Sequence, residues 1–149
     1  MTHCIEQLKP DFLIHLGDHY DDGEVLREEY PNILIHQVPG NCDLHRMVHI
    51  APETICYNVC GVKLLMTHGH RHHVKTGVYY LFEDAKTMGV QAALFGHTHI
   101  PHKEKRDGIW LFNPGSCGNG GGTVGVIEIE NGEILDCKIL KAEEWEEIV

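Results

Sequence analysis

The sequence contains no long apolar run, no excess of basic residues and no closely paired cysteines. Its 149 residues include 12 Lys and Arg against 22 Asp and Glu, a formal net charge of −10 with histidine neutral. No apolar run approaches the ~18 residues of a membrane-spanning helix. The first ten residues lack the basic start and apolar centre of a signal peptide. We therefore expect a cytoplasmic protein with no membrane partner.

The acidic balance excludes a general binder of the nucleic-acid backbone, because such a protein needs a basic face. One site can still bind phosphate, since a bound metal ion reverses the local field. The six cysteines form no C-x-x-C pair, so in a reducing compartment we expect free thiols. Cys56 and Cys60 flank a bend and are interpreted as small buried apolar residues rather than as a facing pair.

The first third of the chain has the pattern of a parallel strand–helix–strand unit. Residues 11–18, DFLIHLGD, have the apolar run of a short buried strand, and residues 32–41 contain a second run that stops at Pro-Gly. The polar stretch 21–30 between them predicts a helix, with Asp22 as its cap. Residues 4–10 are interpreted as the end of an earlier helix.

The rest of the chain consists of β-rich segments around one further helix. Residues 53–69 form two β-rich runs about a Cys-Gly turn and predict a hairpin. Residues 75–89 have apolar positions at helical spacing and end at Gly89, a typical helix C-cap. Further strands are expected at residues 91–96, at 108–113 after the polar turn KEKRDG, and at 123–140 around Asn131-Gly132.

These segments together predict one α/β domain over residues 1–149. We expect two β-sheets that pack face to face, with the helices outside. The glycine-rich stretch 118–122 is interpreted as a surface loop, and the acidic tail 141–149 as a solvated final turn.

Side chains that can bind metal ions follow four of the apolar runs. In open α/β sheets, ligands bind beyond the carboxyl ends of the strands, so side chains that are far apart in sequence can converge there. The residues in question are Asp18 after FLIHLG, Asn41 after ILIHQVPG, His68 after VKLLMT, and His97 and His99 after AALFG.

One carboxylate, one amide and three imidazoles form a mixed oxygen and nitrogen ligand set. This set suits Mn²⁺, Fe²⁺, Zn²⁺ or Ni²⁺ better than Ca²⁺, and it lacks the thiolates of a structural zinc site. His97 and His99 can each reach a different ion of a pair ~3.5–4 Å apart. Either histidine alone has an ordinary structural explanation, but five such residues at strand ends indicate a metal site.

Several short motifs occur in the order found in calcineurin-like metallophosphoesterases, which the chain resembles. They are GD (17–18), GNCD (40–43), THGH (67–70) and GHTH (96–99). HRHHVKTG (70–77) and NPGS (113–116) resemble the small prokaryotic phosphodiesterase branch, to which the retromer subunit is related in fold. The resemblance implies a four-layer α/β/β/α fold and a small-molecule phosphate ester as substrate.

The resemblance also implies a binuclear metal site, with Mn²⁺ as the expected ion. Asp18 would bridge the two ions and His99 would bind the second one. The first ion would be completed by Asn41, His68 and His97, with His70 in the outer shell. A metal-bound hydroxide would attack phosphorus in line, which makes Asp18, Asn41 and His70 the expected catalytic residues.

The family's first strand, which ends in a D-x-H motif, has no counterpart here. MTHC is not a match, because only eight residues separate His3 from the strand that starts at Phe12, and a parallel crossover needs about a dozen or more. We therefore expect one intact metal site, a second one reduced to Asp18 and His99, and a gap in the sheet. A late-assigned start codon or a truncated sequence is the expected reason.

Cys42 stands where many members of the family carry a histidine that assists the leaving group. An ordinary thiol, with a pKa near ~8.5, is a poor substitute, so diesters or activated esters are the expected substrates. The leading hypothesis is a metal-dependent phosphodiesterase. The alternative is a catalytically inactive or impaired metal-binding scaffold of the same fold, because the D-x-H ligands are absent. A homo-oligomer remains an open alternative.

Other polar residues have ordinary structural interpretations. We expect Asp43 to cap a turn. We expect His72, His73 and His102 to be solvated loop residues near the mouth of the site.

Overall fold

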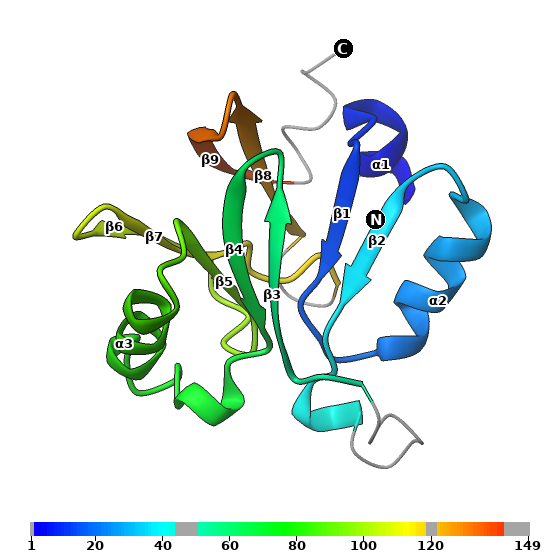
Figure 1. Ribbon diagram of the computed structural model, residues 1–149. Helices are drawn as coiled ribbons and strands as arrows, with labels where there is room; N and C mark the ends of the chain where they lie inside the picture. Colours follow the sequence, from blue (N-terminus) through cyan, green and yellow to red (C-terminus); the bar gives the residue numbers. More distant parts are fainter. Residues whose placement is uncertain (1, 44–50, 119–121, 142–149) are drawn as a thin grey trace.

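The computed structural model describes residues 2–43, 51–118 and 122–141 (Figure 1). The predicted glycine-rich loop lies partly, and the acidic tail almost wholly, outside the described residues. The elements within these ranges are α1 (Thr2–Leu8), β1 (Phe12–His15), α2 (Tyr20–Glu29), β2 (Leu34–Gln37), η1 (Asn41–Asp43), β3 (Thr54–Val59), β4 (Val62–Thr67), η3 (His70–His72), α3 (Tyr79–Met88), β5 (Ala92–Phe95), β6 (His102–Arg106), β7 (Ile109–Asn113), β8 (Thr123–Glu130) and β9 (Glu133–Lys141).

The strands form two β layers with helices outside, so the predicted α/β/β/α arrangement is confirmed. One layer is a five-stranded sheet of order β3-β4-β5-β7-β6. The other layer consists of two separate pairs, the parallel pair β1–β2 and the antiparallel hairpin β8–β9. Helix α3 covers the outer face of the five-stranded sheet, while α1 and α2 lie against β1–β2 (Figure 1).

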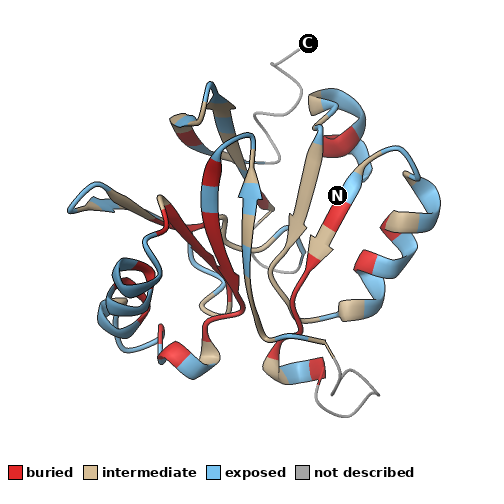
Figure 2. Cartoon of the chain, viewed as in Figure 1, coloured by how far each residue is buried: buried red, intermediate tan, exposed pale blue. Residues whose placement is uncertain are grey.

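The core lies on both faces of the five-stranded sheet, because side chains alternate along its strands. Leu65 and Phe95 point towards α3 and belong to one buried cluster with Leu81 of that helix. Leu64 and Leu94 point the other way and form a second cluster, against which side chains of β1, β8 and β9 pack. Figure 2 shows this burial concentrated in β4, β5 and β7.

Strand β1 is less buried than its apolar sequence predicts. All four of its residues, Phe12–His15, are half-buried. Among the described strands, β1 pairs with β2 and with no strand on its other edge. A strand with one neighbour keeps part of its backbone and side chains open. Among the described residues no strand joins the β1–β2 pair to the β8–β9 hairpin, as expected for a layer that lacks one strand.

The predicted turn KEKRDG is wrong over most of its length. Residues His102–Arg106 form β6, which pairs antiparallel with β7, and the turn itself is confined to Asp107-Gly108. Charged side chains are tolerated because β6 is the edge strand of the sheet. The lysines Lys103 and Lys105 also lie over the ring of Trp110 on β7.

Three local predictions need correction. Helix α2 begins at Tyr20 and its N-cap is His19, so Asp22 lies inside the first turn and does not cap it. Helix α3 begins only at Tyr79, although it ends at Gly89 as expected. Cys56 and Cys60 are exposed rather than buried, because β3 is the other edge strand and Cys60 is at its turn.

The hairpin predictions are confirmed at both positions. β3 and β4 pair antiparallel about Cys60-Gly61, and β8 and β9 pair about Asn131-Gly132 with φ values of 52° and 80°. Two positive φ values are what the Asn-Gly signal predicts. No helix in the described part of the chain is both long and apolar enough to cross a membrane.

Candidate metal centre

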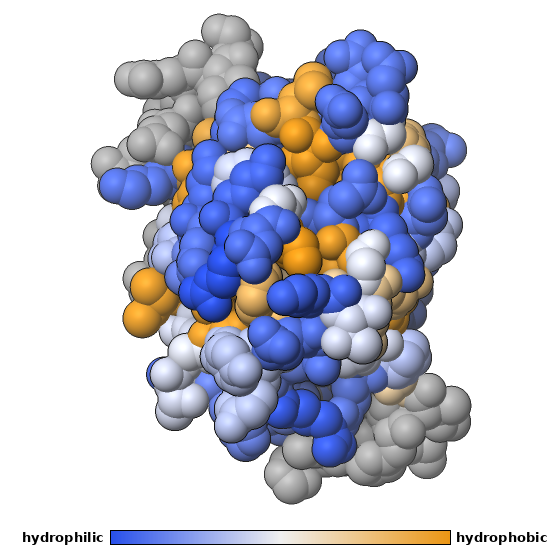
Figure 3. All heavy atoms as spheres, turned by 60° about the vertical axis from the view of Figure 1, so that its left-hand side comes forward, coloured by the Kyte–Doolittle hydropathy of each residue, from blue (hydrophilic) through white to orange (hydrophobic). Residues whose placement is uncertain are grey.

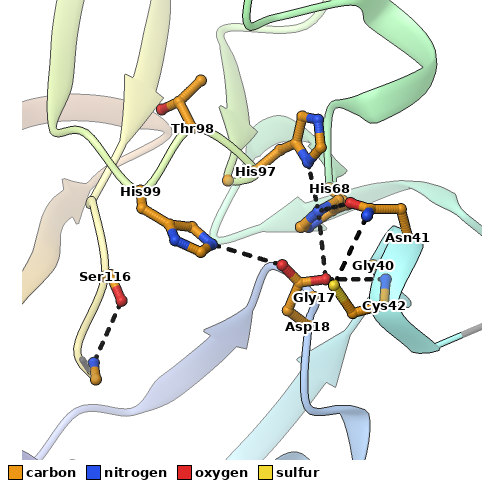
Figure 4. A network of polar contacts seen from close by, with 12 residues as sticks. Gly17, Asp18, Gly40, Asn41, Cys42, His68, His97, Thr98, His99 and Ser116 are labelled. Carbon is orange, nitrogen blue, oxygen red and sulfur yellow. Dashed lines mark hydrogen bonds and ion pairs between the residues drawn. The ribbon is translucent and has the colours of Figure 1, made fainter. Parts of the chain in front are cut away.

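The structure brings all five predicted ligand residues to one edge of the two β layers. Asp18 follows β1, Asn41 opens η1 after β2, His68 follows β4, and His97 and His99 follow β5. Their side chains point towards one another in Figure 4. His68 Nε2 lies 3.1 Å from Asn41 Oδ1, 3.1 Å from His97 Nδ1 and 3.6 Å from Asp18 Oδ1. His99 Nε2 lies 3.5 Å from Asp18 Oδ2.

The tautomer of His68 determines what the cluster can bind. His68 Nδ1 lies 2.7 Å from the carbonyl oxygen of Leu16, which can only accept a hydrogen bond. The proton of the neutral ring is therefore on Nδ1, and Nε2 presents a lone pair. This lone pair faces the amide oxygen of Asn41 and the carboxylate of Asp18, which are also acceptors. Several lone pairs directed at one point fit a cation.

The separations between these atoms fit a transition-metal ion. Bonds of ~2.0–2.1 Å to nitrogen and oxygen place the ligands of a tetrahedral ion about 3.3 Å apart, close to the 3.1–3.6 Å found around His68. In the described ranges no group of three His, Cys, Asp or Glu side chains has the arrangement of a metal site. The predicted ligand set includes the amide oxygen of Asn41 as well.

Two glycines allow this close approach. A Cβ on Gly17 would lie 2.6 Å from His68 Nδ1 and 2.8 Å from the backbone nitrogen of Gly40. A Cβ on Gly40 would lie 2.3 Å from Asp18 Oδ1. All three distances are shorter than a real Cβ atom tolerates, so the GD and GN motifs need glycine for space.

Three of the five candidate ligands have a left-handed backbone. Asp18, His97 and His99 have φ values of 58°, 66° and 58°. For residues with a side chain this conformation costs about 1–3 kcal/mol each. The surrounding contacts hold these residues there, and such strain is typical of functional loops.

Two buried polar residues hold the loops in place. Asn113 Nδ2 donates to the carbonyl of Gly96 at 2.9 Å and to Thr98 Oγ1 at 3.0 Å, so the end of β7 fixes the His97–His99 loop. The carboxylate of Asp43 accepts from the backbone N–H groups of Tyr20 at 3.0 Å and Gly40 at 2.7 Å. Asp43 therefore caps both a turn and helix α2, which agrees with its expected capping role.

The electrostatics favour a neutral His97 beside a charged Asp18. Burial, His68 and Lys75 lower the pKa of His97 to about 4. Burial acts to raise the pKa of Asp18, but His68 and hydrogen bonds from Cys42 and His99 outweigh it, and the pKa is lowered. At neutral pH Asp18 is therefore an anion close to the neutral ring of His97.

Cys42 and His70 lie beside the cluster. The backbone N–H of Cys42 donates to Asp18 Oδ1 at 3.2 Å, and Asn41 Nδ2 contacts Cys42 Sγ at 3.7 Å. Burial and Asp18 raise the pKa of the Cys42 thiol, so it is neutral at pH 7. The ring of His70 lies 5.4 Å from that of His68, and its buried Nδ1 has no hydrogen-bond partner among the described residues.

The remaining histidines differ in how far they are exposed to solvent. His73 is exposed as expected, and His102 lines a cavity near the site. His72 is buried, and its Nε2 lies 3.0 Å from the carboxylate of Asp84 on α3. The prediction that His72 is a solvated residue is therefore wrong. Sequence reasoning did not identify Gly17, the carbonyl of Leu16 or Asn113 as parts of the site. The glycines in GD and GNCD and the Asn of NPGS were the available signals.

Comparison with known proteins shows the family of this chain. Residues 1–132 match the family model of the calcineurin-like phosphoesterase superfamily domain. The chain is 32% identical over 110 residues to a "probable metallophosphoesterase" of Mycoplasma pneumoniae. The aligned region covers 72% of this chain and 64% of the relative. The chain thus spans less than two thirds of that relative's length.

Two solved structures share the fold. One is a conserved uncharacterized protein, a predicted phosphoesterase, of Streptococcus pneumoniae, with a TM-score of 0.73, 23% identity, and 95% and 83% of the two chains covered. The other is a single mutant of Vps29 from Entamoeba histolytica, with a TM-score of 0.70, 16% identity, and 93% and 87% covered.

Proposed function

Because this chain belongs to the calcineurin-like phosphoesterase superfamily, we propose that it is a metal-dependent phosphoesterase that hydrolyses phosphodiesters. The observation that carries the proposal is the convergence of lone pairs around His68 Nε2. Asn41 Oδ1 and His97 Nδ1 lie 3.1 Å from that atom, and Asp18 Oδ1 lies 3.6 Å from it. Asn41 Oδ1 and Asp18 Oδ1 only accept hydrogen bonds and His68 Nε2 carries no proton, so these three atoms face one another unfavourably without a cation.

Asp18, Asn41, His68 and His97 would hold one divalent cation. Asp18 Oδ2 and His99, which are 3.5 Å apart, are the two groups among the described residues that would begin a second site. We therefore propose a strong first site and a weak second one. Mn²⁺ is the proposed ion, and Ni²⁺, Zn²⁺ and Fe²⁺ suit the same ligands.

A bound cation supplies Lewis acidity, which activates water and offsets the charge of the phosphate oxygens. The residues of the chain orient and hold the site. Leu16 keeps the proton of His68 on Nδ1, and Cys42 N–H fixes the carboxylate of Asp18. His70 has a depressed pKa because of burial and His68, so its neutral ring is available as an outer-shell proton acceptor.

The neutral thiol of Cys42 supports a diester rather than an alkyl monoester as substrate. Burial and Asp18 raise its pKa, and it does not offer a proton as readily as an imidazolium. A substrate whose leaving group needs no protonation, such as an aryl diester, avoids this demand.

A second candidate function is a metal-binding scaffold without catalysis. The observation in its favour is the second ion site, where the described residues provide only Asp18 and His99. In that case the first cation would bind but would not support turnover.

Metal binding and turnover are tested together. We expect calorimetric titration with Mn²⁺ to show one tight site, with His68→Asn or Asn41→Ala weakening it at least 100-fold and His99→Ala less than tenfold. The contrast follows from exposure, because the His68 side chain is 2% exposed and that of His99 is 60% exposed. Circular dichroism checks that each variant is folded.

Turnover is measured with bis-p-nitrophenyl phosphate and p-nitrophenyl phosphate, with and without Mn²⁺ or Ni²⁺. Metal-stimulated hydrolysis that favours the diester agrees with the proposed activity. Tight metal binding without turnover of either ester supports the scaffold. If His68→Asn binds Mn²⁺ as tightly as the wild type does, the cluster is not the metal site.

A further inference from the structure

A cavity of about 460 Å³ lies next to the loop that carries His97 and His99. Thr98, between the two histidines, points away from Asp18 in Figure 4 and contributes to the cavity wall. The opposite wall comes from the segment before α3, with Val74, Lys75 and Val78. This volume lies within the ~300–1,000 Å³ range of small-molecule sites.

The floor of the cavity is apolar and rigid. Val74 and Phe95 are 5% and 1% exposed and belong to the buried cluster beneath α3. At the rim, Ile100 is 67% exposed, so its apolar side chain is open to solvent beside the cavity. Figure 3 shows the face with α3 and the β6–β7 hairpin, where apolar surface is open between hydrophilic regions. The apolar floor and the exposed apolar side chain at the rim favour an apolar ligand group.

Lys75 connects the cavity with the metal-ligand cluster. Its side chain lines the cavity, and its positive charge acts on both His97 and Cys42. His102, on the wall formed by β6, lies 3.2 Å from the carboxylate of Glu104 through its Nε2, so Lys75 is the basic group of this cavity. In a chain of net charge −10, this basic character beside the cluster is the feature that an anionic substrate would meet.

The second cavity at the site has the opposite character. It measures about 400 Å³ and is lined by His19, Cys42 and three carboxylates, those of Asp21, Asp22 and Asp43. Carboxylates repel a phosphate ester, and this cavity has no apolar floor. Of the two cavities, only the one with Lys75 suits an anion that carries an apolar group.

We propose that the cavity beside Lys75 receives an aromatic, ring-sized substituent of the phosphodiester, with the Lys75 ammonium facing a phosphate oxygen. The substrate class is therefore the phosphodiesters that carry an aromatic group close to the phosphorus atom. Ile100 and Val78 determine this specificity by covering the ring, and Lys75 positions the phosphate. The inference rests on the proposed function and names the substrate class for the same site.

The experiment compares two phosphonates that differ only in the group on phosphorus. Methylphosphonate reports on the metal and Lys75 alone, while phenylphosphonate adds the ring. With the Zn²⁺-loaded chain, we expect calorimetry to show phenylphosphonate binding roughly tenfold tighter, or more, because the ring is removed from water. Lys75→Met, which keeps the apolar stem, should weaken both ligands.

Two variants test the place of the ring. Val78→Trp fills the cavity and Ile100→Ser removes its apolar rim, so each should abolish the preference for phenyl and leave methylphosphonate affinity unchanged. That unchanged affinity also shows that the variant is folded. Leu135→Ser is the matched control, since Leu135 is 56% exposed on β9 and does not line the cavity; it should keep the preference.

The outcomes separate the two proposals. If methylphosphonate does not bind the Zn²⁺-loaded chain, the proposed function fails and the inference fails with it. If methylphosphonate binds but phenylphosphonate binds no tighter, only the aromatic specificity is overturned. A phenyl preference that survives both Val78→Trp and Ile100→Ser likewise overturns it, because the ring then lies elsewhere.

Discussion

His68 donates its Nδ1–H to the carbonyl of Leu16 at 2.7 Å, across 52 positions of the sequence. This contact joins the end of β4 to the segment after β1, and so it links the two β layers at the site. It also leaves Nε2 as a lone pair directed at Asn41 and His97. A structural hydrogen bond thus decides the chemistry of the ring on its other side.

This contact requires Gly17, which predicts the result of a matched pair of substitutions. Gly17 and Gly108 have similar φ values, 97° and 83°, but a Cβ at Gly17 would meet His68 and Gly40, whereas one at Gly108 meets nothing within 4 Å. Gly108→Ala should lower the free energy of unfolding by about 1 kcal/mol from backbone strain. Gly17→Ala should lower it by roughly 3 kcal/mol, because overpacking adds to the strain.

Urea unfolding measures both values, and calorimetry with Mn²⁺ measures the site. Gly17→Ala should also weaken metal binding, while Gly108→Ala should not. Equal destabilisation of the two variants would show that the close approach of His68 to Gly17 is not needed.

Asn113 gives a prediction about the His97–His99 loop. Asn113 is fully buried, donates to Gly96 and Thr98, and accepts from the backbone N–H of Gly115 at 2.8 Å. Asn113→Ala leaves the buried carbonyl of Gly96 and the half-buried Thr98 and Gly115 without this partner, and it should cost about 2–3 kcal/mol of unfolding free energy. It should also weaken metal binding, because His97 loses its fixed position.

The variant Asn113→Asp separates the two contacts. It keeps an acceptor for Gly115 but cannot donate to the carbonyl of Gly96. We expect it to weaken metal binding as Asn113→Ala does. Full metal affinity in Asn113→Asp would mean that the donor side of Asn113 does not hold the loop.

The metal-free protein should lose stability below neutral pH. Burial, His68 and Lys75 lower the pKa of His97 to about 4, from an ordinary value of 6.5. Between these values the unfolded chain binds a proton that the folded chain does not, so the free energy of unfolding decreases as the pH falls from about 6.5 towards about 4. Above about pH 6.5 the free energy of unfolding does not depend on the titration of His97. Each pKa unit corresponds to about 1.4 kcal/mol before solvent screening.

Urea unfolding in EDTA at pH 5 and pH 7.5 checks this expectation. His97→Gln, which keeps a polar side chain without the titrating ring, should show a smaller difference between the two pH values. If the wild type and His97→Gln lose the same stability on acidification, the burial of His97 is not the cause.

The segments with strong local signals were predictable. Asn131-Gly132 and Cys60-Gly61 define their hairpins through backbone preferences that do not depend on the rest of the chain. Gly89 ends α3 for the same reason. The organisation of residues 1–149 as one domain stays a prediction.

The errors occurred where neighbours in space override local preference. The charged run of β6 forms a strand because β7 pairs with it and Trp110 lies under its lysines. Asp22 does not cap α2 because the helix begins earlier, at Tyr20, whose N–H is satisfied by Asp43 from a distant segment. The apolar β1 is only half-buried because its second edge has no partner among the described strands.

The sequence by itself determined that Asp18, Asn41, His68, His97 and His99 lie at one edge, since they follow apolar strands whose ends meet there; their role as cation ligands stays a prediction. It also determined the alternation that gives the five-stranded sheet a core on each face. Only the tertiary structure decided the direction of each lone pair, the space made by Gly17 and the cavity beside Lys75. These depend on contacts between distant segments, which local preferences do not encode.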